Sequence, residues 1–355
     1  MMEHKLQFNF AATQKIIRQI SRIDQFKGEW KSFDHQGNRY LNELRKIATI
    51  QSIGSSNRIE GNTMTDAEVS SLIKNLTISK LQNRDEQEVA GYYDTLETVL
   101  NNYEDIDLTI SGIHGLHHLL LKYSSKDDRH RGRYKEMNNQ VVATYPDGTT
   151  RVIFKPTEPY LVQKEMGDLV AWTNQAMSNQ EIHPLIAIAT FIYELLSIHP
   201  YHDGNGRLSR LLTNLLLLKS GYVFVQYESL EHIVEHNKAA YYQALMEGQK
   251  HCNQEQECID KWMLFFLNSL VELIDKLDAK VKAFRVLGGY LNERQKAVLE
   301  YVRAYQPVKI GDIIKGLKIY TLASVKKDLQ YLVKELELEK LGDNKGTIYI
   351  INKNK

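Results

Sequence analysis

The sequence predicts a mainly α-helical protein, and three observations lead to that fold class. Apolar residues recur with helical spacing along most of the 355 residues, and only six prolines interrupt the pattern. Two strongly apolar segments, 184–198 and 210–222, are expected to be helices at the centre of a domain. The length is sufficient for two or three domains, and the sequence shows no internal repeats.

Residues 1–100 are expected to form an N-terminal helical region. The run 41–53 has helical spacing, and the polar, glycine-containing stretch 54–69 after it is expected to separate two helices. The central domain is placed at residues 101–250, because both strongly apolar helices lie there.

A β-hairpin is expected within the central domain. Residues 141–145 and 151–154 are rich in β-prone side chains, and Pro146, Asp147 and Gly148 between them favour a turn. Isolated two-stranded hairpins are only marginally stable. We therefore expect this hairpin to pack on helices or to accept a partner strand.

The last part of the chain is expected to be a separate domain. Residues 251–287 have the pattern of a helical linker, and Gly288 and Gly289 mark a boundary. The order of three helices and a short hairpin in 288–355 resembles a winged helix-turn-helix. This segment has 13 Lys or Arg and eight Asp or Glu, which weakly favours binding to nucleic acid.

On this reading, three lysines of the C-terminal domain would contact DNA phosphates. Lys326 and Lys327 fall on the expected recognition helix, and Lys345 falls on the wing. The alternative is that the domain binds protein or mediates a homodimer, because winged helices also serve as protein-docking modules and solvated lysines are ordinary.

Whole-chain composition excludes several classes of protein. The 45 Lys and Arg nearly balance the 44 Asp and Glu, so net charge gives no reason to expect a nucleic-acid or membrane partner. The N-terminal stretch lacks the apolar core of a signal peptide, and no segment reaches transmembrane length. A cytoplasmic location is expected.

The chain has two cysteines, Cys252 and Cys258, which are too few for a disulfide framework. We expect two free thiols at the surface. A zinc site that combines them with His251 is the alternative, although no fourth ligand is visible in the sequence.

A polar loop joins the two apolar helices. Gly204, Asn205 and Gly206 stand where the second helix begins, so free backbone N–H groups and the helix dipole favour an anion such as phosphate. Arg207 and Arg210 are three positions apart and can present two cations on one helix face.

Two further residues complete the expected chemistry of this loop. An acid among phosphate-binding groups, Asp203, is consistent with a Mg²⁺ ion. His199 can accept a proton near neutral pH, so the loop suits phosphoryl or nucleotidyl transfer. The alternative is a turn that only reverses the chain, with the histidine as a helix cap.

The segment HPYHDGNGRLSR at 199–210 resembles the signature of the Fic family, HPFx(D/E)GNGRxxR, with Tyr201 in place of phenylalanine. The likeness covers roughly residues 40–250 and includes the hairpin. It implies a Fic helical fold with a hairpin flap. It also implies a protein adenylyltransferase, which moves AMP from ATP to Ser, Thr or Tyr hydroxyls of target proteins.

The resemblance assigns roles to the loop residues. His199 would be the base toward the target hydroxyl, and Asp203 would bind Mg²⁺. Asn205 and the loop N–H groups would hold the α-phosphate, while Arg207 and Arg210 would hold the β- and γ-phosphates.

The resemblance also implies binding surfaces beyond the loop. Tyr242 and Gln249 would border the adenine, although packing between helices is an equal alternative for Tyr242. The target protein would dock on the hairpin near 140–156 by adding a strand to it.

A motif upstream of the loop resembles the inhibitory pattern (S/T)xxxE(G/N) of some Fic enzymes. It begins at Ser56 and includes Glu60. In the family this glutamate pairs with the second arginine of the signature, here Arg210, and so restrains ATP. In some relatives the same residue positions water that removes AMP from modified proteins, so deAMPylation is a further expectation.

Two other functions remain as alternatives. One is a winged-helix transcription regulator whose Fic core only senses a nucleotide. The other is a Fic enzyme with kinase or phosphocholine-transfer chemistry. An acid and two arginines suit a complete Mg²⁺-bound triphosphate, which favours AMP transfer.

Overall fold

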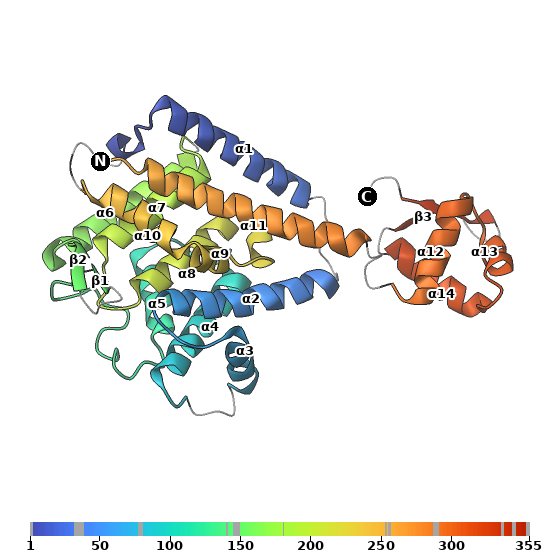
Figure 1. The fold of residues 1–355 in the computed structure, drawn as a ribbon, viewed down its shortest axis with the longest axis horizontal. Coiled ribbons are helices and arrows are strands. Elements are labelled where there is room, and N and C mark those ends of the chain that lie inside the picture. Colours follow the sequence, from blue (N-terminus) through green and yellow to red (C-terminus); the bar gives the residue numbers. More distant parts are fainter. Residues whose placement is uncertain are drawn as a thin grey trace. The chain divides into compact units, whose positions relative to one another are not determined.

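The structure is a computed structural model of the 355-residue chain (Figure 1). It describes residues 3–31, 39–76, 81–139, 141–144, 150–179, 181–252, 254, 257–286, 291–334, 337–342 and 346–352. The chain divides into two compact units, Met1–Asp278 and Ala279–Lys355. Helices predominate in both, which confirms the mainly α fold class.

The first unit is built from eleven helices among its described residues, the last of which continues past the unit boundary. They are α1 (Phe10–Lys31), α2 (Arg39–Ile59), α3 (Asp66–Asn75), α4 (Arg84–Asn102), α5 (Ile110–Leu120), α6 (Pro159–Asn179), α7 (Pro184–Ile198), α8 (Asn205–Lys219), α9 (Leu230–His236), α10 (Lys238–Gln249) and α11 (Asp260–Val286). Short 3₁₀ turns at Glu3–Leu6 and Val223–Gln226 complete the unit.

Helices α7 and α8 form the centre of this unit, as their apolar sequences predict. Every residue of α7 from Ala187 to Ile198 is buried, because neighbouring helices cover all of its faces. α6 packs against α7, and α4 and α5 pack against α8. Two buried helices therefore hold the ends of the loop between them in a rigid setting.

The predicted hairpin is present. Strands β1 (Val141–Thr144) and β2 (Thr150–Phe154) pair antiparallel, with Thr144 opposite Thr150 and an irregularity after Val141. β2 contacts α10, so the hairpin packs on a helix as expected for a two-stranded ribbon. The predicted turn residues 146–148 lie outside the described residues.

The structure corrects the expected break at 54–69. α2 continues six residues into this run and ends at Ile59, and Gly61 follows with a φ of 98°. The predicted break between two helices is therefore present, but it is confined to residues 60–65. Gly54 is tolerated inside the helix because it leaves room for Arg58 and Asp66, which would clash with a Cβ there. Ser56 therefore lies in the last turn of a 21-residue helix, and Glu60 follows directly after its end.

The second unit has the element order that the sequence predicts. Its elements are α12 (Glu293–Tyr305), α13 (Ile310–Gly316), α14 (Leu322–Lys334), β3 (Leu338–Leu341) and β4 (Ile348–Ile351), the strands being antiparallel. Val298, Ile313 and Leu329 belong to its own apolar core. The buried Asp328 of α14 pairs with Arg294 of α12. Residues 288, 289 and 345 lie outside the described part.

Two other expectations concern the whole chain. Cys252 and Cys258 are free, but both are half-buried instead of lying fully at the surface. No group of metal ligands that includes them or His251 occurs among the described residues. In the same part of the chain, no helix is long and apolar enough to cross a membrane.

Candidate active site

The loop between α7 and α8 is held in one conformation at both ends. His199 ends α7 with φ 51° and ψ 60°, the one non-glycine residue with positive φ among those described. A left-handed conformation is unfavourable for a histidine unless the surroundings impose it. The buried Lys135 contributes, since its backbone N–H donates to Pro200 O (2.9 Å) and its Nζ to Ile198 O (3.2 Å).

Asn205 fastens the other side of the loop. Its Oδ1 accepts from the backbone N–H of Tyr201 (2.9 Å), and its Nδ2 donates to Tyr201 O (2.8 Å). Asn139 donates to the same carbonyl from the segment before the hairpin (3.1 Å). The Asn205 side chain therefore builds the loop, and a role toward the α-phosphate remains a prediction.

Tyr201 is fully buried and its hydroxyl has a partner. The hydroxyl hydrogen-bonds to Nδ1 of His114 (2.9 Å), and the ring stacks on His117 with centroids 3.7 Å apart. The tyrosine thus replaces the expected phenylalanine without leaving an unpaired polar group.

His117 of α5 locks the acidic part of the loop. Its Nδ1 accepts from the Gly132 N–H (2.9 Å), so its Nε2 carries the proton and donates to Asp203 O (3.0 Å). Burial lowers the pKa of His117 to about 4, which keeps this neutral tautomer at pH 7. Gly204, with φ 80°, fits tightly over the same ring.

Asp203 and Arg207 form an ionic cluster with two residues of α4. Arg207 Nη2 lies 3.2 Å from Asp203 Oδ1 and its Nη1 lies 3.5 Å from Glu88. Arg84 reaches the other oxygen of Asp203 at 3.5 Å. Burial opposes ionisation of Asp203, but Arg207, the Gly204 N–H and Arg84 outweigh it and lower the pKa of the carboxyl.

Arg210 is buried and bound to the end of α2. Its Nε donates to Ser56 Oγ (2.7 Å), and its Nη2 donates to Ser56 O (2.9 Å) and to Glu60 Oε1 (2.7 Å). Burial opposes the charge of Glu60, yet Arg210 outweighs it and lowers the pKa of this carboxyl. A Cβ at Gly206 would collide with Glu60 Oε1. Ser56, Glu60 and Arg210 therefore meet, as the motif predicts.

Several donors in this site have no hydrogen-bond acceptor among the described residues. They are Nε and Nη1 of Arg207 and Nη1 of Arg210, all in buried side chains. The N-cap residue Gly204 also supplies no side-chain cap to α8, which leaves first-turn N–H groups available. Buried donors are normally satisfied, so this arrangement fits a polyanionic ligand.

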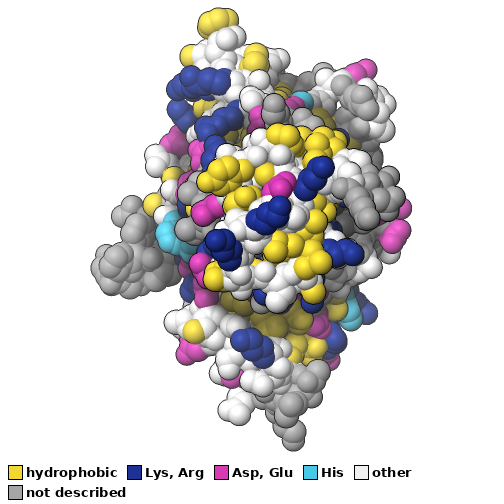
Figure 2. Space-filling model, turned by 90° about the vertical axis from the view of Figure 1, so that its right-hand side faces the viewer, with side chains coloured by type: hydrophobic (Ala, Val, Ile, Leu, Met, Phe, Trp, Pro, Cys, Tyr) yellow, Lys and Arg dark blue, Asp and Glu magenta, His cyan; other side chains and the backbone are white. Residues whose placement is uncertain are grey.

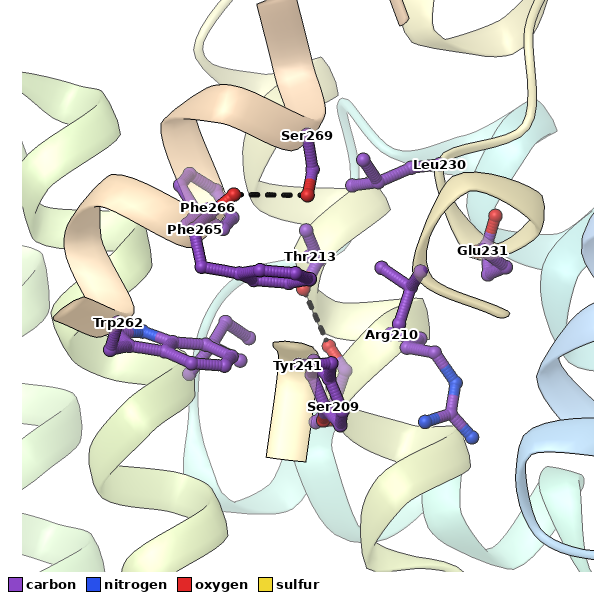
Figure 3. Close-up of a pocket in the computed structure, with 12 residues that line it drawn as sticks. Ser209, Arg210, Thr213, Leu230, Glu231, Tyr241, Trp262, Phe265, Phe266 and Ser269 are labelled. Atoms are coloured by element: carbon purple, nitrogen blue, oxygen red, sulfur yellow. Dashed lines mark hydrogen bonds between the residues drawn. The ribbon is translucent and has the colours of Figure 1, made fainter. Parts of the chain in front are cut away.

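A small apolar cavity lies behind Arg210. It measures about 30 Å³, room for one or two water molecules. Figure 3 shows the Arg210 guanidinium turned away from Trp262 and Phe265, which lie on the other side of the cavity. This apolar packing leaves the charged group facing α2.

His199 is the base candidate, and its surroundings keep it neutral. Burial, followed by the charge of Lys135, lowers the pKa of its imidazole to about 4. Glu60 and Asp203 oppose this shift only in part. Its Nδ1 faces Leu196 O at 3.4 Å. A neutral imidazole is the form that can accept a proton.

The predicted adenine-side residues lie on α10. Tyr242 is half-buried, and burial and then the charge of Glu60 raise the pKa of its hydroxyl. Gln249 is buried and donates to Ser197 Oγ (3.1 Å), two residues before His199. Gln249 therefore ties α10 to the loop, while contact of either residue with adenine stays a prediction.

Sequence reasoning missed four residues that build this site. Lys135, His117, Glu88 and Tyr241 are all buried, and Tyr241 lines the small cavity beside Arg210. A buried ionisable residue on a helix was the available signal for His117, Glu88 and Tyr241, whereas Lys135 lies outside the helices. Only the fold shows that these helices meet at one loop.

The comparisons with known proteins agree with this geometry. Residues 107–217 match the family model described as Fic/DOC family. The matched region runs from the residues just before α5 into α8 and resembles a Fic domain. The chain resembles "Protein adenylyltransferase Fic" of Drosophila grimshawi, with 30% identity over 58% of the chain and 40% of the relative. The Drosophila melanogaster protein of the same name is 31% identical, over 58% and 39%.

The curated relatives are longer, since the matched region spans about 40% of their length. Solved structures share the fold. A Fic family protein from Desulfovibrio desulfuricans has a TM-score of 0.62 at 21% identity and covers 96% of each chain. Fic-1 from C. elegans has a TM-score of 0.60 at 21% identity, covering 76% of this chain and 74% of that one.

Proposed function

We propose that this protein transfers AMP from ATP to hydroxyl groups of target proteins and that Glu60 restrains the reaction. The observation that most directly supports this proposal is the set of contacts made by Arg210. This buried cation belongs to a cluster of donors at the start of α8, and Glu60 and Ser56 hold two of its nitrogens. The adenylyltransferase name of the Drosophila relatives supports the choice of reaction.

In this proposal the start of α8 holds the triphosphate. The first-turn N–H groups donate to phosphate oxygens, as do the nitrogens of Arg207 and Arg210 that lack a hydrogen-bond acceptor among the described residues. His199 accepts the proton of the target hydroxyl. The hydroxyl oxygen forms a bond to the α-phosphorus while the bond to the β-phosphate oxygen breaks, and pyrophosphate leaves.

The residues present fit a Mg²⁺ ion beside the phosphates. Asp203 has a lowered pKa and is therefore ionised, and its side chain is 28% exposed. A hard carboxylate oxygen is the ligand that Mg²⁺ prefers. Bound Mg²⁺ would neutralise phosphate charge, and Asp203 would hold it.

Glu60 restrains the site through charge and through space. Its carboxylate pairs with Arg210, which is thereby unavailable to the γ-phosphate. It also contacts the Gly206 backbone, where the phosphates approach the helix. About a third of the Glu60 side chain is exposed, so it can leave the site without unfolding the core. Its position near His199 also suits the positioning of water for AMP removal.

The target is proposed to present a Ser, Thr or Tyr hydroxyl along the hairpin. The β1–β2 ribbon offers outer-edge backbone groups for an added strand. Its contact with α10 brings it to the helix that carries Tyr242. On the same helix, Tyr242 and Gln249 would border the adenine of the bound nucleotide.

The decisive experiment compares wild type, Glu60→Ala and Glu43→Ala with α-labelled and γ-labelled ATP in lysate. Glu43 is a matched control, since its ion pair with Lys46 on α2 is exposed. We expect Glu60→Ala alone to raise label transfer from the α-position, at least tenfold. Adding His199→Ala to Glu60→Ala should lower label transfer on the order of 100-fold, because the general base is lost. Label from the γ-position alone would show a kinase and contradict the proposal.

The C-terminal unit supports a second candidate role in nucleic-acid binding. Lys326 and Lys327 are exposed on α14, the third helix of the unit. On the face drawn in Figure 2, however, Lys and Arg lie among hydrophobic and uncharged groups without merging into one basic surface. If α14 binds DNA, Lys326→Ala should weaken binding to all sequences and lower the salt dependence by about one phosphate contact. Unchanged binding would contradict this role.

A further inference from the structure

Helix α9 carries three potential metal ligands on one face. His232, Glu235 and His236 stand at positions i, i+3 and i+4, which lie one above the other on a helix. One ligand atom from each lies within 4.8 Å of the other two. This is the one such group of histidine, cysteine and carboxylate side chains in the described part of the chain.

One of the two histidines, His236, is already oriented as a ligand. Nδ1 of His236 lies 2.8 Å from the backbone oxygen of His232 and donates to it, which leaves Nε2 with a free lone pair. Ligand histidines commonly donate their other nitrogen in this way. The two rings lie edge to face with centroids 4.2 Å apart. His236 is exposed, so an ion can reach the cluster from solvent.

We propose that His232, Glu235 and His236 bind a divalent transition-metal ion of the zinc class. Two imidazoles and one carboxylate are ligands that Zn²⁺ accepts, with water in the fourth position. Tetrahedral ligand atoms at about 2.0–2.1 Å from the metal lie about 3.3 Å apart. Rotation of the exposed His236 and release of Glu235 from Arg58 would close the present spacing.

The site adjoins the inhibitory helix. Glu235 accepts from Nε (2.6 Å) and Nη2 (2.9 Å) of Arg58, and Nδ1 of His232 lies 3.3 Å from Ser55 Oγ. Arg58 and Ser55 belong to α2 and flank Ser56, which holds Arg210. A metal ion therefore competes with Arg58 for Glu235.

This competition links the metal to the end of α2. Arg58 would keep Asp66 and the Met64 carbonyl as partners, so α2 would loosen without losing all of its contacts. The consequence for AMP transfer, a weaker hold of Glu60 on the site, rests on the proposed function. Binding of the metal itself does not.

Calorimetric titration of the full chain with Zn²⁺ tests the site directly. We expect one ion per chain, with an affinity reduced on the order of 100-fold in His236→Ala. His251→Ala is the matched control, because His251 is also exposed and lies in the alternative group with the two cysteines. Equal binding by wild type and His236→Ala, or equal loss in His251→Ala, would overturn the proposal.

A second variant tests the competition with Arg58. Removal of this cation in Arg58→Ala frees Glu235, so Zn²⁺ should bind more tightly, on the order of tenfold. If the two histidines bind the metal without Glu235, Arg58→Ala will have the same Zn²⁺ affinity as wild type. This outcome would overturn the three-ligand site. Because both titrations measure binding and need no ATP, their failure is distinguishable from absence of AMP transfer.

Discussion

At the scale of single residues, two buried tyrosine hydroxyls under the loop differ in whether they have a hydrogen-bond partner. Three aromatic side chains, Tyr201, His114 and Tyr134, surround one another under the loop. The hydroxyl of Tyr201 has a partner in His114, whereas the buried hydroxyl of Tyr134 has none among the described residues. The same chemical group is therefore stabilising at one position and costly at the other.

This contrast leads to a matched pair of substitutions. Tyr201→Phe should lower the free energy of unfolding by about 1 kcal/mol, because His114 loses its partner. Tyr134→Phe removes an unpaired buried hydroxyl and should leave stability unchanged or raise it. Urea unfolding of both variants measures the difference. Equal losses would show that the Tyr201 hydroxyl has no stabilising role.

The protonation of His199 gives a prediction about pH. Its lowered pKa of about 4 means that the imidazole stays neutral as the pH falls from 8 to 5.5. The base thus remains available over this range, whereas an ordinary histidine would be half protonated near pH 6.5. Histidine NMR signals, with His199→Ala for assignment, measure the midpoint. A midpoint at or above 6.5 would contradict the buried, neutral base.

At the scale of elements, the junction of α2 with α8 carries the ion pair between Glu60 and Arg210. The end of α2 brings Ser56 and Glu60 onto the first turns of α8. Gly206 permits this close approach, since its backbone is helical and a side chain is excluded only by Glu60. A Cβ at position 206 is therefore excluded for as long as Glu60 stays paired with Arg210.

A double-mutant cycle tests that dependence. Gly206→Ala should destabilise the wild type by about 1–3 kcal/mol, because Glu60 must move away. In a Glu60→Gly background the same change should be neutral or stabilise by up to about 1 kcal/mol, since alanine favours a helix. Thermal unfolding of the four proteins gives the coupling energy. Additive effects would mean that Gly206 and Glu60 do not touch.

At the scale of the whole molecule, the two units differ in their contribution to the site. Each of the site residues named above lies within Met1–Asp278. The second unit has a separate apolar core that includes Val302, Val325 and Leu332. Chemistry and stability of the first unit should therefore not require the second.

Removal of the second unit tests this independence. A chain ending at Val286 keeps α11 whole and should unfold cooperatively. With Glu60→Ala it should transfer AMP within about threefold of the full-length variant, since no site residue is lost. Label transfer and circular dichroism measure the two properties. A folded truncation without transfer would assign the second unit a role in the reaction.

Much of the fold and of the site is predictable from local sequence. The apolar runs of α7 and α8 predict buried helices, and the turn residues predict the hairpin, because both signals depend on neighbours in the chain. The extent of α2 was mispredicted. Gly54 and the serines after it favour a break locally, yet packing of Arg58 against Asp66 and Glu235 keeps the helix intact.

The sequence by itself determined the mainly helical fold and the polar loop at 199–210, because the residues of a motif are adjacent and their chemistry is local. Only the tertiary structure decided which distant groups complete that loop. Lys135, His117 and Glu88 come from separate segments, and the charge of Lys135 helps to lower the pKa of His199. Likewise, only tertiary packing places Arg58 of α2 against Glu235 in the His232, Glu235 and His236 group on α9. Such pairings depend on how the helices pack, since partners 177 residues apart leave no local pattern.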